Sequence, residues 1–298
     1  MKRILSTILI TVFMLSGCAS EDVNHDKKIN IVTSTTMLGD LVKQIGQDMV
    51  HVDMLFGPGI DPHLAMPTGG DTRKIQVADL VVFNGLHLEA HFDQILNAYE
   101  NKTVLVGDNL DRNKLIYVDG DAIDPHIWFD LALWQDSARF VGEALIEFDN
   151  ENKDIYEENL ITYLEKLDDL HQWTLNKVSE LDKTQKVLVT AHDAFNYFAN
   201  AYDFEVAAIS GISTEGEVTT QDINDTASII IDKKVKAIFL ESSVPQTMVD
   251  AVISEVNRRG QDVTIGESLF SDAIGVGEYE EFINAFKFNV ESIVEGLK

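Results

Sequence analysis

Positive charge is scarce in this chain. Its 298 residues include 23 Lys and Arg against 50 Asp and Glu, which gives a formal net charge of −27 at pH 7. Such an acidic surface repels phosphate backbones, so we exclude nucleic acid as a partner. The acidic residues are spread along the chain, and we interpret them as a solubilising surface rather than as a metal site.

A long apolar run is also missing. The first hydrophobic stretch, residues 4–15, has about twelve residues, whereas a membrane-spanning helix needs roughly twenty. It follows the cations Lys2 and Arg3, and it precedes the small residues Ser16 and Gly17. We therefore expect residues 1–17 to be a signal peptide for export and not a transmembrane helix.

Cysteine is limited to Cys18, which directly follows Leu15-Ser16-Gly17 as in a bacterial lipobox. We expect Cys18 to carry a lipid that anchors the chain at the extracytoplasmic face of the cell membrane. The alternative is an ordinary signal peptide followed by a chance cysteine. A lipidated Cys18 leaves no thiolate for a disulfide or a metal. Residues 18–28 are polar and charged, which predicts a flexible tether.

Apolar, β-branched segments alternate with helix-like stretches from residue 29 onward, and this alternation predicts an α/β fold with parallel, doubly wound sheets. The predicted strands are residues 29–33, 50–56, 80–83, 103–106, 186–190, 205–209, 235–240 and 263–266. The predicted helices cover about 37–45, 194–201, 221–233 and 247–259. A mature chain of about 280 residues is at the length where single cores divide, so we expect two lobes.

Between the lobes, residues 154–181 contain neither Gly nor Pro. Apolar residues recur there at steps of three and four: Leu160, Leu164, Leu167, Leu175, Val178 and Leu181. His171 and Thr174 bridge the one break in this spacing. This pattern predicts one helix of about 42 Å, a stiff strut along both lobes that disfavours large hinge closure. The expected domains are an N-terminal lobe at 29–150, a linking helix at 151–184 and a C-terminal lobe at 185–298. His171 on this helix is expected to be packed or solvated.

Candidate metal ligands gather where predicted strands end. Asp-Pro-His occurs twice, at Asp61-Pro62-His63 and Asp124-Pro125-His126, and each Pro restricts the backbone before its His. His192 and Asp272 follow two strands of the second lobe. The carboxyl ends of parallel strands border the ligand crevice of an open sheet. Three imidazoles and one carboxylate suit a divalent transition ion.

The roles of two aspartates and of one further pair of histidines stay open. Asp61 and Asp124 could each orient the imidazole two residues later, or each could cap its own turn. His87 and His91 are spaced i and i+4, so on a helix they could bind a metal together. We favour a structural or surface role for this histidine pair.

Taken together, the motifs resemble the metal-receptor family of ABC-importer solute-binding proteins, solute-binding protein family 9, which contains TroA, PsaA, MntC and ZnuA. The matching segments are 59–63 (GIDPH), 84–89 (NGLHLE), 124–128 (DPHIW), 190–195 (TAHDAF), 241–243 (ESS) and 270–273 (FSDA). The resemblance covers essentially the whole mature chain. It implies that His63, His126, His192 and Asp272 are the metal ligands, with His at the third position as in TroA.

The same resemblance implies two α/β lobes joined by a rigid backbone helix, with the metal held between the lobes and delivered to an ABC permease and its ATPase. We expect a monomeric receptor. Zinc importers of the family often carry a His-rich loop, whereas residues 108–123 contain no histidine, so Mn(II) is the favoured cargo. Zn(II) is the alternative, because the nitrogen-rich ligand set suits it and a given site normally binds zinc more tightly than manganese.

Two other classes of protein compete with the receptor. A metallohydrolase needs an open coordination position and a general base, for which Glu215 or Glu217 could be considered, but no spacing supports this role. The sequence lacks a Gly-x-Ser-x-Gly elbow, a Walker loop and a dinucleotide fingerprint, so we predict that the protein is not an enzyme. A surface adhesin is compatible with lipid anchoring and could coexist with transport.

Overall fold

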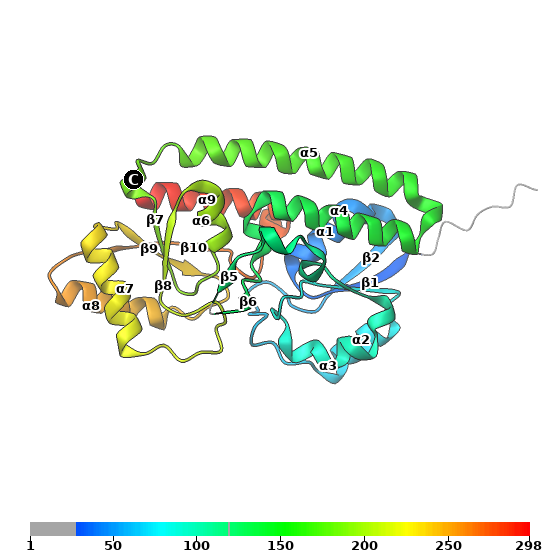
Figure 1. Cartoon of the computed structure of the whole chain (residues 1–298), viewed down its shortest axis with the longest axis horizontal. Coiled ribbons are helices and arrows are strands. Elements are labelled where there is room, and N and C mark those ends of the chain that lie inside the picture. The colour runs from blue at the N-terminus through cyan, green and yellow to red at the C-terminus, as the bar shows by residue number, and fades with distance from the viewer. Residues whose placement is uncertain (1–27, 119) are drawn as a thin grey trace, which may run out of the picture.

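The structure, a computed structural model, describes residues 28–118 and 120–298 (Figure 1). The predicted signal peptide, the lipidation position Cys18 and the tether up to residue 27 lie outside these residues. Within the described part of the chain, no helix has both the length and the apolar character that crossing a membrane requires.

The N-terminal lobe is built on a four-stranded parallel sheet with the order β2-β1-β3-β4. Its strands are β1 (Ile29–Thr33), β2 (Val50–Met54), β3 (Leu80–Phe83) and β4 (Thr103–Leu105). Every residue of β3 is buried, as is typical of a parallel strand covered on both faces. All four predicted strands are confirmed, although β2 and β4 end slightly before the predicted residues.

Two layers of helix cover this sheet because side chains alternate across each strand. Ile31 of β1 packs into the core on the side of α1 (Thr36–Gly46), whereas Val32 faces the opposite cluster, which includes Ile75 and Leu96. Those two residues belong to α2 (Gly69–Val77) and α3 (Asp93–Ala98). A short antiparallel hairpin, β5 (Tyr117–Val118) and β6 (Ala122–Ile123), then leads to the second Asp-Pro-His.

The C-terminal lobe repeats the parallel plan. β7 (Val187–Thr190) pairs with β8 (Glu205–Ala208), β9 (Ala237–Glu241) pairs with β10 (Thr264–Leu269), and β9 lies beside β7. The helices of this lobe are α6 (Asn196–Tyr202), α7 (Thr220–Lys233) and α8 (Thr247–Arg258). α7 begins with a capping box, in which Thr219 and Asp222 accept each other's backbone N–H groups. These elements confirm the predicted ones apart from shifts at their ends.

Three long helices lie across one side of the molecule: α4 (Leu131–Phe148), α5 (Lys153–Val178) and α9 (Phe282–Leu297) (Figure 1). α5 runs along both lobes and packs against α1, α4 and α9, which confirms the predicted strut. It ends at Val178, before the predicted end at residue 181, because the chain turns after that residue. The sequence analysis did not identify α4 or α9, nor α2 and α3 of the N-terminal lobe.

The buried face of α5 differs in part from the predicted apolar stripe. Leu167 and Val178 are buried as expected, but the side chain of Leu175 faces outward and the residue is 38% exposed. Aromatic and polar residues complete the buried face, which consists of Tyr156, Tyr163, Leu167, Leu170, Thr174 and Val178. His171 packs beside Tyr202, with its Nδ1 3.1 Å from the tyrosine hydroxyl, as expected of a packed histidine.

A single hydrophobic core connects the two lobes. It includes Ile31 of β1, Trp134 of α4, Leu167 of α5, Val189 of β7 and Ile293 of α9. The lobes therefore do not have separate cores on this side, and moving one lobe as a rigid body would disturb the packing of both. The fold is the expected α/β architecture with parallel sheets.

Candidate metal centre

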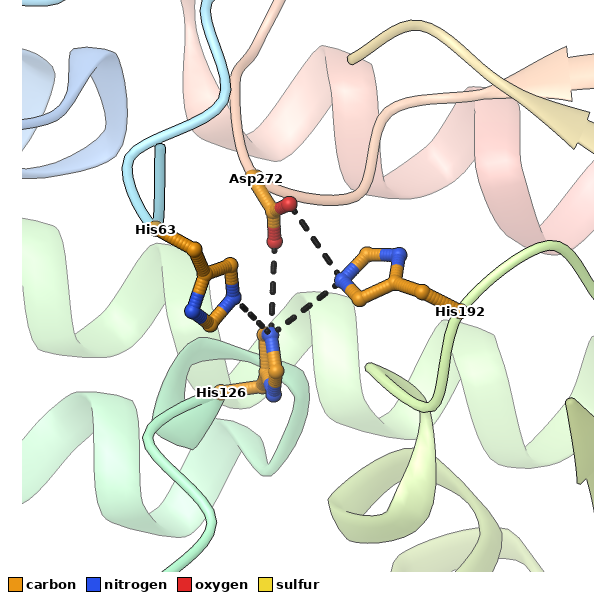
Figure 2. A group of neighbouring side chains, drawn as sticks. All are labelled: His63, His126, His192 and Asp272. Carbon is orange, nitrogen blue, oxygen red and sulfur yellow. Dashed lines mark hydrogen bonds and ion pairs between the residues drawn. The ribbon is translucent and has the colours of Figure 1, made fainter. Parts of the chain in front are cut away.

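Four titratable side chains from loops in both lobes converge on one point (Figure 2). His63 lies in the loop after β2, and His126 follows the β5–β6 hairpin. His192 comes two residues after β7, and Asp272 comes three residues after β10. Because these loops leave the carboxyl ends of strands, they meet where an open α/β sheet carries its ligand site.

The distances within this group are short and nearly equal. His126 Nε2 lies 3.3 Å from His63 Nε2 and 3.4 Å from His192 Nε2. Asp272 Oδ1 lies 3.4 Å from His126 Nε2, and Asp272 Oδ2 lies 3.3 Å from His192 Nε2. One ligand atom from each of the four residues lies within 4.8 Å of the others, and no residue is more than 5% exposed.

This spacing fits a bound transition ion. Bonds of about 2.1 Å from nitrogen or oxygen to a tetrahedral ion place neighbouring ligand atoms about 3.4 Å apart. Asp272 Oδ1 is buried without a hydrogen-bond partner, so its lone pairs are available to an ion. Both carboxylate oxygens face histidine nitrogens (Figure 2), so one or both could bind. The structure thus brings together all four residues that the sequence nominates, and their role as ligands stays a prediction.

The histidines differ in how readily they lose a proton. Burial lowers the pKa of His63 to about 3, because a charged ring would lose its hydration there. Burial also opposes charge on His126, but the carboxylates of Asp124 and Asp272 outweigh it and raise the pKa of His126 to about 9. His63 is therefore neutral at pH 7, whereas His126 holds a proton that an incoming metal ion must displace.

His192 and Asp272 form a coupled pair. Burial disfavours charge on both, yet Asp272 and Glu241 raise the pKa of His192 well above its ordinary value. In turn, His192 and His126 hold the pKa of Asp272 well below the usual range of a carboxyl. Protons on His126 and His192 thus supply positive charge beside the Asp272 carboxylate, as a divalent cation bound there would.

The two Asp-Pro-His motifs place their aspartates differently. Asp124 Oδ1 accepts the backbone N–H of His126 at 3.0 Å and lies 2.7 Å from its ring Nδ1, so it both caps the turn and orients the imidazole. Asp61 Oδ1 accepts the backbone N–H of His63 at 2.9 Å, and its Oδ2 accepts the hydroxyl of Thr214 at 2.6 Å. Asp61 therefore caps its turn and ties it to the other lobe, without a hydrogen bond to the His63 ring.

Glu241 is the main site residue whose role the sequence analysis did not identify. At the end of β9, it accepts the backbone N–H of His192 at 2.8 Å and contacts ring Nδ1 through its other oxygen. It thus gives His192 the partner that Asp124 gives His126. The sequence could have indicated this role, because Glu241 begins the ESS segment at the end of a predicted strand. Ser243, from the same segment, donates to Asp272 Oδ2 at 3.3 Å.

Buried hydrogen bonds from the NGLHLE segment of the N-terminal lobe support the second Asp-Pro-His motif. The side-chain amide of Asn84 donates to the carbonyl oxygen of Pro125 at 3.0 Å. The buried carboxyl of Glu89 accepts the backbone N–H groups of Asn84 and Gly85 at 3.0 and 3.1 Å. Burial raises the pKa of Glu89 to about 7. This contact explains why the NGLHLE segment belongs with the site motifs although none of its residues is in the four-residue group.

The remaining histidines of interest lie elsewhere. His91 contacts Glu215 near the surface, with 2.9 Å between His91 Nε2 and Glu215 Oε1. Neither His87 nor His91 belongs to the metal-type cluster found among the described residues. Glu215, which we considered as a general base, is thus engaged at the surface between the lobes.

Known proteins resemble this chain over its full length. It is 33% identical over 307 residues to the manganese-binding lipoprotein MntA of Bacillus subtilis, covering 100% of this chain and 99% of the relative. It is 36% identical to the zinc-binding protein TroA of Treponema pallidum, covering 99% and 98%. It is 31% identical to the manganese ABC transporter substrate-binding lipoprotein PsaA of Streptococcus pneumoniae, covering 100% and 99%.

The fold comparison agrees with these relatives. The structure of the periplasmic zinc-binding protein TroA from Treponema pallidum superposes with a TM-score of 0.89 at 36% sequence identity, covering 91% of this chain and 99% of that protein. Such proteins are solute-capturing receptors of transporters and not enzymes. Residues 31–296 match the family described as zinc-uptake complex component A, periplasmic (ZnuA), and the chain therefore belongs to this family of metal-binding receptors of ABC transporters.

Proposed function

We propose that this protein captures a divalent transition metal ion outside the cytoplasm and delivers it to the permease and ATPase of an ABC importer. The observation that carries the proposal is the convergence of three buried imidazoles and one buried carboxylate, drawn from both lobes, on a single point. A buried group of this kind without an ion leaves an acceptor oxygen of Asp272 unsatisfied. Binding an ion removes that cost.

The proposed ligands are His63, His126, His192 and Asp272. The first three would bind through Nε2, because those nitrogens face one another across the centre (Figure 2). Nδ1 of His126 and Nδ1 of His192 are turned away toward Asp124 and Glu241. A carboxylate behind a ligating imidazole increases its basicity and holds its orientation.

Manganese is the proposed cargo. Both oxygens of Asp272 lie near histidine nitrogens, so a bidentate carboxylate would supply the oxygen donors that Mn(II) favours. Zinc is the alternative, supported by the near-tetrahedral spacing of 3.3–3.4 Å and by the nitrogen-rich ligand set. The relatives divide in the same way, since MntA and PsaA are named for manganese and TroA for zinc.

The proposal includes the organisation of the whole chain. Residues 1–17 would direct export, the lipid on Cys18 would anchor the protein to the membrane, and the folded part would act as a monomer. The lobes at residues 29–150 and 185–298 would hold the ion between them, with residues 151–184 as the link. The lipoprotein names of MntA and PsaA support the anchor.

A metal-competition titration tests this proposal. The full chain, purified in detergent and stripped of metal, is titrated with Mn(II) and Zn(II) as wild type, His192→Ala and His51→Ala. We expect one ion per chain in the wild type and in His51→Ala, whose exposed imidazole lies outside the site. His192→Ala should weaken binding by at least about 100-fold, because it removes a ligand from a four-ligand site.

The outcomes separate the candidate functions. Measurable Mn(II) affinity would support manganese as cargo, and zinc binding with negligible Mn(II) affinity would point to a zinc importer. Absence of binding of either ion to the wild type would overturn the receptor. Ester or peptide hydrolysis that disappears in His126→Ala would instead support a metallohydrolase, and metal-independent binding to a host surface would support an adhesin.

A further inference from the structure

Trp128 joins the two halves of the candidate site. It stands two residues after His126, in the short turn of helix formed by Ile127–Phe129, and it is 2% exposed. Its indole Nε1 donates to the carbonyl oxygen of Ser271 at 3.0 Å, and Ser271 directly precedes Asp272. One buried N–H group of the N-terminal lobe thus holds the backbone of the segment that carries a candidate ligand of the C-terminal lobe.

The indole ring also contacts the imidazole that it follows. The rings of Trp128 and His126 meet edge to face, with centroids 5.3 Å apart and planes at 75°. Trp128 therefore touches His126 through its ring and the Asp272 segment through its N–H. The ring and the N–H group belong to one rigid indole, which turns about only two torsions. If the two segments moved apart, no rotation of the indole could therefore preserve both contacts.

The segment from Asp124 to Trp128 makes a second connection of the same kind. Asp124 Oδ2 accepts the side-chain amide of Asn196 at 3.1 Å, and the backbone oxygen of Asp124 accepts the hydroxyl of Tyr197 at 2.9 Å. Asn196 and Tyr197 begin α6, shortly after His192. The segment from Asp124 to Trp128 is therefore bound at its first residue to the start of α6 and at its last residue to the segment before Asp272.

We propose that Trp128 is a positioning residue whose N–H group holds Asp272 against His126 and thereby slows release of the ion. This inference rests on the proposed metal-binding function. An ion bound by both His126 and Asp272 can leave only if these two segments separate. Separation breaks the buried bond between Trp128 and Ser271, and a buried carbonyl that loses its donor has no water to replace it. An ion enters by the reverse of the same path, so the bond opposes separation of the two segments in both directions and slows entry as well as release.

The test compares two tryptophan-to-phenylalanine variants of the full chain in detergent. Trp134 is a matched control, because it is also buried and donates an N–H···O bond of similar length, 3.1 Å to the hydroxyl of Tyr163. That bond joins α4 to α5, and neither Trp134 nor Tyr163 belongs to the group of four candidate ligands. Trp128→Phe and Trp134→Phe each remove one N–H group and leave a comparable space.

Dissociation of Co(II), Mn(II) and Zn(II) into a chelator is followed by stopped flow, together with the visible absorption of the Co(II) form. Trp128→Phe should speed dissociation about fivefold to tenfold, the effect of one buried hydrogen bond, and should speed association by a similar factor. It should also shift the Co(II) bands, because Asp272 would bind in a changed orientation. Trp134→Phe should leave the dissociation rate and the Co(II) bands unchanged.

Equal dissociation rates and equal Co(II) spectra in both variants would overturn the positioning role while leaving the receptor function intact. Failure of the wild type to bind any ion would instead overturn the proposed function. If Trp128→Phe does not fold, 3-benzothienylalanine at position 128 replaces the N–H with sulfur and preserves the ring size. Faster release from that variant supports the role, and wild-type release refutes it.

Discussion

Asp61 and Asp124 occupy the same place in the same tripeptide, yet their side chains act on different groups. Both cap their own turn by accepting the N–H of the residue two positions later. Only Asp124 also reaches the imidazole ring, whereas the second oxygen of Asp61 is bound to Thr214. The sequence left both roles open for each aspartate, and the neighbours supplied by the fold decide between them.

This difference predicts unequal effects of the same substitution. Asp124→Asn should weaken metal binding about 10- to 100-fold, because the ring of His126 loses the carboxylate that orients it and increases its basicity. Asp61→Asn should weaken binding less, since its amide oxygen can still cap the turn. Isothermal titration of both variants with the same ion measures the two effects. Equal losses would show that the carboxylate contact with the His126 ring is unimportant for binding.

The pKa shifts at the site predict how binding depends on pH. From the ordinary histidine pKa, the sequence predicts that affinity declines below about pH 6. The structure raises the pKa of His126 to about 9 and that of His192 well above its usual value. Metal binding must displace these protons, so affinity should already fall as pH decreases from about 9.

Titration at pH 7 in buffers of different ionisation enthalpy measures the protons released per ion. We expect at least about one proton, with affinity changing about tenfold per pH unit for each proton displaced. His63 contributes none at this pH, because burial has lowered its pKa to about 3. An affinity that stays constant from pH 8 to pH 5 would count against all three histidine ligands.

At the scale of elements, α5 shows which features of a helix its apolar periodicity predicts. The absence of Gly and Pro and the spacing of leucines predict its existence and most of its length. The same spacing places both Thr174 and Leu175 along the buried face, and the structure buries Thr174 but leaves Leu175 38% exposed. Helical periodicity alone does not decide which of two neighbouring positions is buried, and the packing of α5 against α1, α4 and α9 selects between them.

Two leucine substitutions test this assignment of faces. Leu167→Ala should lower the free energy of unfolding by about 2–5 kcal/mol, because it opens a cavity in a fully buried position. Leu175→Ala, at a position 38% exposed, should cost less than about 1 kcal/mol. Urea denaturation of the metal-free proteins measures both. A larger loss from Leu175→Ala would mean that α5 is rotated from the described orientation.

Two of the four described helices that the sequence analysis did not identify, α4 and α9, carried usable patterns. α4 buries Leu131, Trp134, Ala138, Val141 and Leu145, and α9 buries Phe282, Phe286, Val290, Ile293 and Leu297. Both sets repeat at three- and four-residue steps, so helical periodicity was present in each segment. The short hairpin β5–β6 is different, because two-residue strands give too little alternation to recognise.

For the whole molecule, the continuous core predicts cooperative unfolding. Residues from both lobes pack together along α4, α5 and α9, so neither lobe can lose its packing without exposing apolar surface of the other. We expect one thermal transition, with tryptophan fluorescence and circular dichroism changing together. Two separated transitions would show that the lobes fold independently despite the shared core.

Metal should stabilise the same transition. An ion that binds only the folded chain at about 100 times its dissociation constant adds about 2.7 kcal/mol. Calorimetry with and without the ion measures the shift, and His192→Ala should abolish most of it. An equal shift in that variant would place the bound ion elsewhere on the molecule.

The sequence by itself determined the α/β class, the strut, the four candidate ligands and their family, because these follow from local periodicity, turn residues and short motifs. Only the tertiary structure decided which oxygen faces which ring, how burial and carboxylates divide the histidine pKa values, and that Trp128 binds the segment before Asp272. The residues of these contacts are far apart in the chain. Their distances depend on how the strands, loops and long helices pack, which no local pattern encodes.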